Sequence, residues 1–141
     1  MTPIESDIVE INNTPEKVYN FLSDLNNFEK IMPEQVINWK STEDSCSFTI
    51  KGMADLSMHI SEKIPYSKIV ITYGEKAPFN FSLICQLNLP TDKNGAKANH
   101  TDAQIILNAE LNTVMEMLAK KPLQNFVNML VTKLKEFGDK L

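Results

Sequence analysis

Two residues of this chain combine a reactive side chain with a position that faces inward in a predicted strand. Tyr73 continues the alternation of Ile69 and Ile71, and Glu62 continues that of Ile60. An inward tyrosine hydroxyl could orient a ligand carbonyl, and an inward carboxylate could act as general acid or base. A buried tyrosine more often has only a structural partner, and a glutamate at a strand end more often reaches solvent. Tyr73 and Glu62 are therefore the catalytic candidates of this sequence.

The histidines and cysteines do not form a recognisable metal or nucleophile site. His59 falls on the outward, polar set of its predicted strand, and His100 lies where a loop meets a strand. Cys46 and Cys85 each alternate with polar residues inside a strand, which favours small buried apolar side chains over a disulfide. No His, Cys or carboxylate cluster has metal-ligand spacing, and the four glycines are dispersed, so we predict no metal site and no cofactor.

Length, composition and charge favour one globular domain. The chain has 141 residues, of which 43% are hydrophobic and 23% charged, so a single domain over residues 1–141 can bury a core. The net charge is −4 and the lysines are interspersed with acids, which argues against nucleic acid as a partner. The first residues carry no signal-peptide pattern, and no stretch is apolar enough to span a membrane. We therefore expect a cytoplasmic protein.

The N-terminal segment predicts a strand followed by two short helices. Residues 4–11 form the strand, and the next helix begins with Thr14 as N-cap and Pro15 in its first turn. Asp24 or Asn26 can cap a second short helix. Apolar residues at helical spacing give both helices one side that faces the core.

Between residues 35 and 111 the hydrophobic period is two, which predicts six further strands. Each strand has an apolar side and a polar side. Since the strands follow one another directly, with a longer polar connection only around residues 92–95, we predict an antiparallel meander. The inward residues are Cys46, Phe48, Ile50, Leu56, Met58, Ile60, Ile69, Ile71, Tyr73, Phe79, Phe81, Leu83, Cys85, Leu87, Ala103, Ile105, Leu107, Ala109 and Leu111.

The C-terminal segment predicts two helices. A short helix over residues 113–119 precedes Pro122, and proline suits the first turn of a new helix better than a helix interior. From Pro122 onward one apolar stripe of about five turns predicts a long amphipathic helix. The stripe comprises Leu123, Phe126, Val127, Leu130, Leu134, Phe137 and Leu141.

The order of these elements is that of an α+β helix-grip fold. In this fold a curved antiparallel sheet, here of seven strands, wraps around a long C-terminal helix, and two short helices follow the first strand. The segment from Val9 to Asp24, with its Ile-Asn, Pro-Glu-Lys-Val-Tyr, Leu and Asp, resembles the opening of the START and polyketide cyclase/dehydratase superfamily (SRPBCC). The resemblance extends over essentially the whole chain in element order. It implies a hydrophobic ligand, such as a lipid, isoprenoid or polyketide, between the sheet and the last helix.

We therefore expect inward residues of the sheet and the facing side of the last helix to line a ligand pocket. The alternative is that the same residues fill a solid core. An empty cavity of ~300 Å³ would cost roughly 7 kcal/mol, which is comparable with the whole stability of a domain. Either side chains fill most of the space, or water or a ligand occupies it. The predicted ligand-binding residues are Phe48, Ile50, Met58, Ile60, Ile71, Tyr73, Phe81, Leu83, Leu107, Met115, Phe126 and Leu130.

Three functions remain open at this point. The first is a carrier or sensor of a hydrophobic small molecule, with residues 112–121 as a gate. The second is an enzyme of cyclase or dehydratase type, which requires Tyr73 and Glu62 to point into one cavity. The third is a homodimer or protein interaction module that uses the outer face of the sheet. On that face, hairpin registers with residue 70 opposite 84 and 84 opposite 106 would place three apolar residues in one row: Val70, Ile84 and Ile106.

Overall fold

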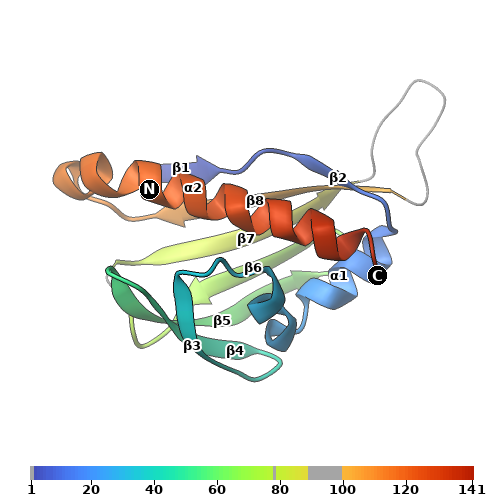
Figure 1. Ribbon diagram of the computed structural model, residues 1–141, viewed down its shortest axis with the longest axis horizontal. Helices are drawn as coiled ribbons and strands as arrows, with labels where there is room; N and C mark the ends of the chain where they lie inside the picture. The colour runs from blue at the N-terminus through green and yellow to red at the C-terminus, as the bar shows by residue number, and fades with distance from the viewer. Residues whose placement is uncertain (1, 78, 89–99) are drawn as a thin grey trace.

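The computed structural model describes residues 2–77, 79–88 and 100–141. Its strands form one antiparallel sheet, and a long C-terminal helix lies across one face of that sheet (Figure 1). The predicted α+β fold, with its curved antiparallel sheet and long C-terminal helix, is confirmed. The elements in chain order are β1 (Thr2–Glu5), β2 (Val9–Ile11), α1 (Pro15–Leu22), the 3₁₀ helix η1 (Leu25–Ile31), β3 (Val36–Ser41), β4 (Ser45–Ile50), β5 (Ala54–Ile64), β6 (Lys68–Tyr73), β7 (Phe81–Asn88), β8 (Thr101–Ala109) and α2 (Thr113–Gly138).

The N-terminal strand is interrupted, so the described sheet has eight strands where the sequence predicted seven. β1 pairs with one end of β8 and β2 with the other, and residues 6–8 separate them. Ser6 stabilises the interruption, because its N–H donates to the Ile105 carbonyl at 2.9 Å and its hydroxyl accepts the Ile105 N–H at 2.9 Å. The serine hydroxyl thus replaces a backbone acceptor of the ladder, which a hydrophobic pattern does not reveal.

The two short helices begin where their capping residues predict. The Thr14 hydroxyl accepts the Lys17 N–H at 3.3 Å, with Pro15 in the first turn of α1. The Asp24 carboxylate accepts the Asn26 N–H at 2.9 Å at the start of η1. Both helices bury their apolar sides, and α1 packs against β6 and β7.

The strands from β3 to β8 form the predicted antiparallel meander. Each strand pairs with its successor in sequence, and buried residues alternate with more exposed ones. Val70 lies opposite Ile84, and Ile84 lies opposite Ile106. The register predicted for the outer apolar row is therefore confirmed.

A β-bulge in β5 turns Glu62 to the outer face of the sheet. Ile60 pairs with Ile71 whereas Glu62 pairs with Val70, so the register shifts by one residue between them. The Glu62 carboxylate lies 3.4 Å from the Lys68 ammonium, and the glutamate side chain is 53% exposed. The inward orientation considered for Glu62 is wrong, because strict alternation ends at a bulge.

The C-terminal segment forms one helix rather than two. α2 begins after Asn112, whose side chain accepts the Met115 N–H at 2.8 Å, and it continues through Pro122. An interior proline removes one backbone hydrogen bond, but Pro122 is exposed and good helix formers flank it on both sides. The predicted break before Pro122 is therefore wrong. None of the helices in the described residues is long and apolar enough to cross a membrane.

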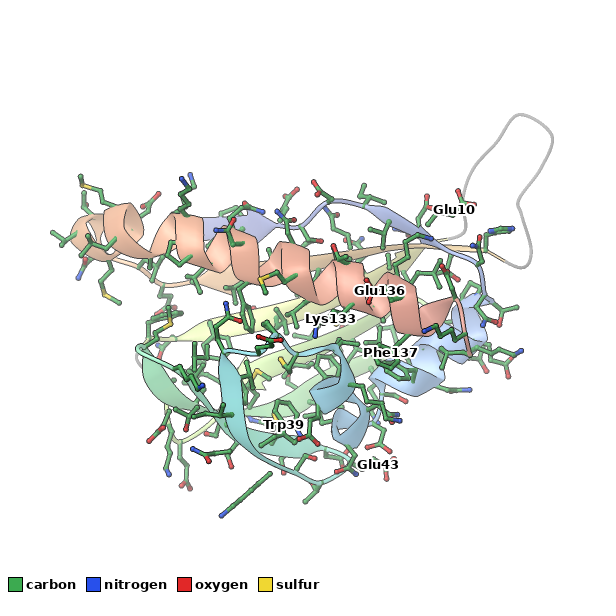
Figure 2. All side chains as sticks on the ribbon, in the orientation of Figure 1. Glu10, Trp39, Glu43, Lys133, Glu136 and Phe137 are labelled. Carbon is green, nitrogen blue, oxygen red and sulfur yellow. The ribbon has the colours of Figure 1, made fainter. Side chains whose placement is uncertain are left out.

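The buried side of α2 departs from the predicted stripe near the end of the helix. Phe137, which Figure 2 labels, is 36% exposed. Leu141 is 42% exposed, whereas Val131, which was not predicted, is buried. Gly138 faces the sheet in place of Phe137, and a Cβ atom built there would lie 2.6 Å from Ile11 Cγ2. The stripe of α2 that contacts the sheet therefore ends at a glycine.

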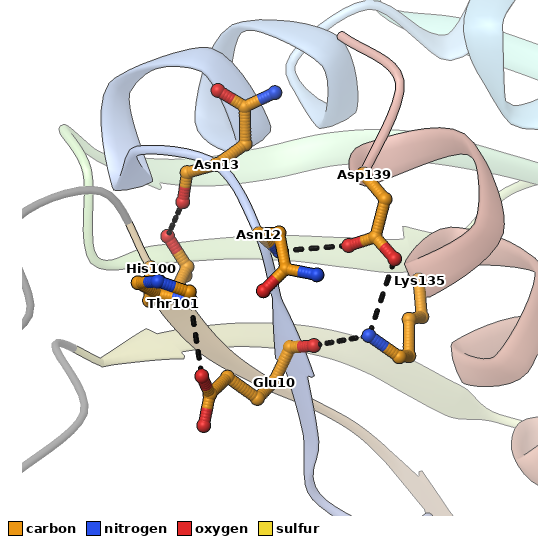
Figure 3. Close-up of polar contacts among 7 residues, drawn as sticks. All are labelled: Glu10, Asn12, Asn13, His100, Thr101, Lys135 and Asp139. Carbon is orange, nitrogen blue, oxygen red and sulfur yellow. Dashed lines mark hydrogen bonds and ion pairs between the residues drawn. The ribbon is translucent and has the colours of Figure 1, made fainter.

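Polar contacts join the end of α2 to β2 and to the start of β8 (Figure 3). Asp139 accepts the Asn12 N–H at 2.7 Å. The Lys135 ammonium donates to the Glu10 carbonyl at 2.6 Å and to the Asp139 carboxylate at 3.2 Å. His100 Nδ1 lies 3.0 Å from Glu10 Oε1. We call these five residues the C-terminal clamp.

Candidate functional site

A small apolar cavity lies between the sheet and α2. Its volume is about 40 Å³. It is bounded by β4, β5, β7 and β8, by residues just outside these strands and by α2. All of its lining side chains are apolar, namely Met32, Phe48, Ile50, Met53, Leu56, Met58, Phe79, Phe81, Leu83, Leu107, Leu123 and Phe126.

The structure brings seven of the twelve predicted ligand-binding residues together around this cavity: Phe48, Ile50, Met58, Phe81, Leu83, Leu107 and Phe126. The other five lie elsewhere. Ile71 and Leu130 are fully buried in the packed part of the core. Ile60, Tyr73 and Met115 are half-buried and do not line the cavity.

Five lining residues were absent from the predicted set: Met32, Met53, Leu56, Phe79 and Leu123. Leu56 and Phe79 have the parity of inward strand residues, and Leu123 belongs to the predicted stripe, so a signal existed for these three. Met32 follows η1 and Met53 lies in the β4–β5 turn. Met32 is one of the apolar residues of the second short helix that the sequence predicts, so a signal existed for it too, whereas Met53 lies in a turn, where sequence periodicity could not place it.

The cavity is much smaller than a pocket for a small molecule. Its volume of about 40 Å³ compares with about 300 Å³ or more for typical ligand pockets. Side chains fill most of the space between the sheet and α2, which avoids the penalty of a large empty cavity. A ligand of the predicted kind can enter only if some of these side chains move.

A surface groove adjoins the cavity between the β4–β5 turn and α2. The groove has a volume of about 360 Å³. Four apolar side chains line both the groove and the cavity, and we call them the gate residues: Ile50, Met53, Leu123 and Phe126. Three polar side chains line the groove and not the cavity: Gln35, Lys51 and Asn125.

None of the twelve residues that line the cavity is an acid, a base or a nucleophile. Tyr73 lies close by, with its ring centroid 6.2 Å from that of Phe81, but Glu62 is on the opposite face of the sheet. The convergence of Tyr73 and Glu62 that an enzyme would require is not formed. Cys46 and Cys85 are free and buried, and burial raises the pKa of both thiols to about 12, so they are neutral near pH 7.

Trp39 packs against the cavity wall and is the single tryptophan of the chain. Its ring stacks on that of Phe48, with centroids 5.2 Å apart and planes at 20°. The indole Nε1 is buried and has no hydrogen-bond partner among the described residues (Figure 2 labels Trp39). Because Phe48 lines the cavity, the fluorescence of Trp39 should respond to changes inside it.

The histidines lie away from the cavity. His59 is exposed on β5, and His100 contacts Glu10 in the C-terminal clamp. In the described ranges, no group of three or more His, Cys, Asp or Glu side chains could hold a metal ion.

No protein-family model matches this sequence, and no curated protein matches it. Solved structures resemble it in fold. XoxI from Bacillus cereus has a TM-score of 0.75 at 13% identity, over 98% of this chain and 96% of that one. A conserved protein from Geobacillus kaustophilus has a TM-score of 0.70 at 15% identity, over 99% and 96%. The Aha1 dimer from Colwellia psychrerythraea has a TM-score of 0.67 at 16% identity, over 99% and 97%. These similarities show that the fold is shared with bacterial proteins.

Proposed function

We propose that this protein binds a hydrophobic small molecule between the sheet and α2, as a carrier or sensor, and that it is a member of the START-like (SRPBCC) superfamily. The observation that carries the proposal is the thin wall of gate residues between an entirely apolar cavity and a groove of about 360 Å³. Joined, the two spaces exceed the ~300 Å³ that ligand pockets commonly have. The shared fold and the N-terminal resemblance support the same assignment.

Two of the gate residues, Met53 and Phe126, can move without disturbing the rest of the core. Met53 is 43% exposed in the turn after Gly52, and Phe126 is half-buried, so both side chains have solvent on one side. Methionine is unbranched and adapts to irregular shapes at little cost. Rotation of Met53 and Phe126 into the groove extends the cavity outward.

The two spaces suit a ligand with an apolar body and one polar end. The cavity offers only apolar contacts, whereas Gln35, Lys51 and Asn125 line the groove. Their amide and ammonium groups can bind a carboxylate, carbonyl or hydroxyl. Fatty acids, polar isoprenoids and polyketides have this composition.

Filling the cavity should weaken ligand binding while the fold is kept. Leu107→Phe places a larger side chain against a space of about 40 Å³, so we expect the affinity for the ligand to fall roughly tenfold or more. Oleate and farnesol are suitable probes, titrated against Trp39 fluorescence and checked by native mass spectrometry. Leu87→Phe is the matched control, because Leu87 is buried on the same face of the sheet but does not line the cavity.

A clear negative result would remove this proposal. The protein is purified gently, incubated with a cell lipid extract and weighed by native mass spectrometry. If it carries no hydrophobic adduct and Trp39 fluorescence does not respond to the probes, the apolar residues form a packed core and nothing more.

The outer face of the sheet favours a second candidate function, contact with a protein partner or a second copy. Val70, Ile84 and Ile106 form one row across β6, β7 and β8, and each is partly exposed. Glu62 and Glu5 continue the row at its two ends. An apolar centre with a charged rim is typical of contact surfaces, and one structural neighbour is a dimer.

A charge at the centre of this row should abolish such an association. Ile84→Lys is expected to keep the fold, because the side chain is only half-buried, and to convert any dimer or complex to monomer in size exclusion with light scattering. Gln86→Lys, on the same face of β7, is the control and should change nothing. A monomeric wild type with the same pull-down profile as Ile84→Lys would exclude this candidate.

A further inference from the structure

The first turns of α2 expose apolar side chains that the fold does not use. Val114 is 65% exposed, Met117 is 80% exposed and Leu118 is 74% exposed. Their spacing of three and four residues places them on one side of the helix. Figure 1 shows these turns extending past the end of the sheet. We call Val114, Met117 and Leu118 the helix tip.

Core packing does not account for the helix tip. Leu123, which is 4% exposed, follows Val114 by nine residues and therefore lies on the opposite side of the helix. Single exposed apolar residues are normal on a protein surface, but a contiguous group marks a contact surface. The helix tip is such a group.

Lysines border the helix tip. Lys121 follows Met117 by four residues and Leu118 by three, so it lies on the same side of the helix. Lys120 follows Met117 by three residues and lies at the edge of this side. Both lysines are exposed, and no carboxylate of the described residues lies within ion-pair distance of either. Glu116 lies four residues before Lys120 and lines the same surface groove as Met117, Lys120 and Lys121. Two ammonium groups against one carboxylate leave this part of the helix with a net positive charge, although the chain has a net charge of −4.

We propose that the helix tip docks the protein on a membrane surface that carries anionic lipid headgroups. Its three apolar side chains enter the boundary between headgroups and acyl chains. The long stems of Lys120 and Lys121 bring their ammonium groups to the lipid phosphates. The docking surface lies outside the cavity, so this inference goes beyond ligand binding and does not depend on it.

Charge and shape favour a lipid surface over a second copy of the chain. A two-fold contact centred on the helix tip would bring Lys120 and Lys121 of both copies, four ammonium groups in all, into one interface. Like charges brought together at an interface oppose association. A membrane instead supplies phosphates to both lysines. It also deforms around a projecting helix end, whereas a rigid protein surface can accommodate such an end only in a matching groove.

Vesicle co-sedimentation of the full chain tests the docking. The probes are vesicles of phosphatidylcholine alone and of phosphatidylcholine with phosphatidylglycerol. We expect binding to the vesicles that contain phosphatidylglycerol, and weaker binding at higher ionic strength. The double substitution Met117→Gln with Leu118→Gln should lower the partition coefficient about tenfold. Lys120→Gln and Lys121→Gln should each lower it about fivefold.

The control is Ile8→Gln, because Ile8 is also apolar and 64% exposed but lies between β1 and β2. Its vesicle binding should equal that of the wild type. All of these side chains are largely exposed, so circular dichroism melting should be unchanged in every variant.

Three results would overturn the inference. One is no binding to phosphatidylglycerol vesicles at low ionic strength, and another is an equal loss in the double variant and in Ile8→Gln. The third is a double variant that binds vesicles normally but dissociates a wild-type dimer in light scattering, which would make the helix tip a contact between copies. Leu107→Phe, which tests the ligand cavity, should bind vesicles like the wild type, so failure of one proposal is distinguishable from failure of the other.

Discussion

Gly138 is buried where the end of α2 meets β2. Replacing it with alanine would place a Cβ atom 2.6 Å from Cγ2 and 3.3 Å from Cδ1 of Ile11, which is itself fully buried. Overpacking of this kind costs about 1–3 kcal/mol, whereas alanine adds up to about 1 kcal/mol of helix propensity. We therefore expect Gly138→Ala to lower the free energy of unfolding by about 1 kcal/mol, measured by urea denaturation.

The double variant with Ile11→Ala identifies the cause of that loss. Removing Cγ2 of Ile11 removes the clash, so the destabilisation in the double variant should be smaller than the sum of the two single effects. Equal stability of Gly138→Ala and the wild type would show that the end of α2 can shift away from β2 at no cost.

At the scale of elements, local sequence signals predicted most of the fold. Alternating apolar residues identified the strands of the meander, and Thr14 and Asp24 marked the starts of the two short helices. The outer row of Val70, Ile84 and Ile106 was also predictable, because the alternation of each strand places these residues on the outer face and consecutive strands of a meander pair with each other. Seven of the cavity-lining residues were in the predicted set. Six of them alternate along strands, and Phe126 belongs to the apolar stripe of the last helix.

The departures from prediction depend on residues that are distant in sequence or outside regular elements. Ser6 interrupts the first strand because it exchanges two hydrogen bonds with Ile105, a residue of β8. The bulge that turns Glu62 outward is defined by its pairing with β6, and the strict period of two does not record it. Met53 lines the cavity from a turn, where no periodicity applies. The pattern of each element therefore predicts which side chains face inward, whereas tertiary contacts decide which of these reach the candidate site.

At the scale of the whole molecule, the C-terminal clamp and the candidate site lie at opposite ends of α2. The clamp joins Asp139 and Lys135 to Asn12 and Glu10. Two of the gate residues, Leu123 and Phe126, and the helix tip lie on the side of Pro122 that is away from the clamp or within about one turn of it, and Pro122 removes a backbone hydrogen bond of the helix. Movement of the first half is thus compatible with a fixed C-terminal end. Weakening the clamp should accordingly change global stability without changing the cavity.

The charge of Asp139 provides a test of the clamp that depends on pH. Partial burial raises the pKa of this carboxyl, but the Asn12 N–H and the Lys135 ammonium lower it by more, so the pKa lies below the ordinary value of 3.8. The unfolded state therefore takes up the proton first as the pH falls. The stabilisation by the carboxylate is complete well above pH 3.8 and is lost as the pH falls through the pKa of the folded state.

Asp139→Asn should therefore be less stable than the wild type at pH 7, by less than about 1 kcal/mol because the ion pair is partly exposed. The asparagine keeps an oxygen that can accept the Asn12 N–H, so the difference reports the charge alone. The two proteins should become equally stable once the pH is below the pKa of Asp139 in the folded state, measured by urea denaturation across the pH range. A difference between Asp139→Asn and the wild type that stays constant down to the lowest pH would contradict the assignment. The end of α2 would then be held by neutral hydrogen bonds, such as those that the Asn13 side chain donates to the Gly138 and Leu141 carbonyls at 3.0 and 2.7 Å.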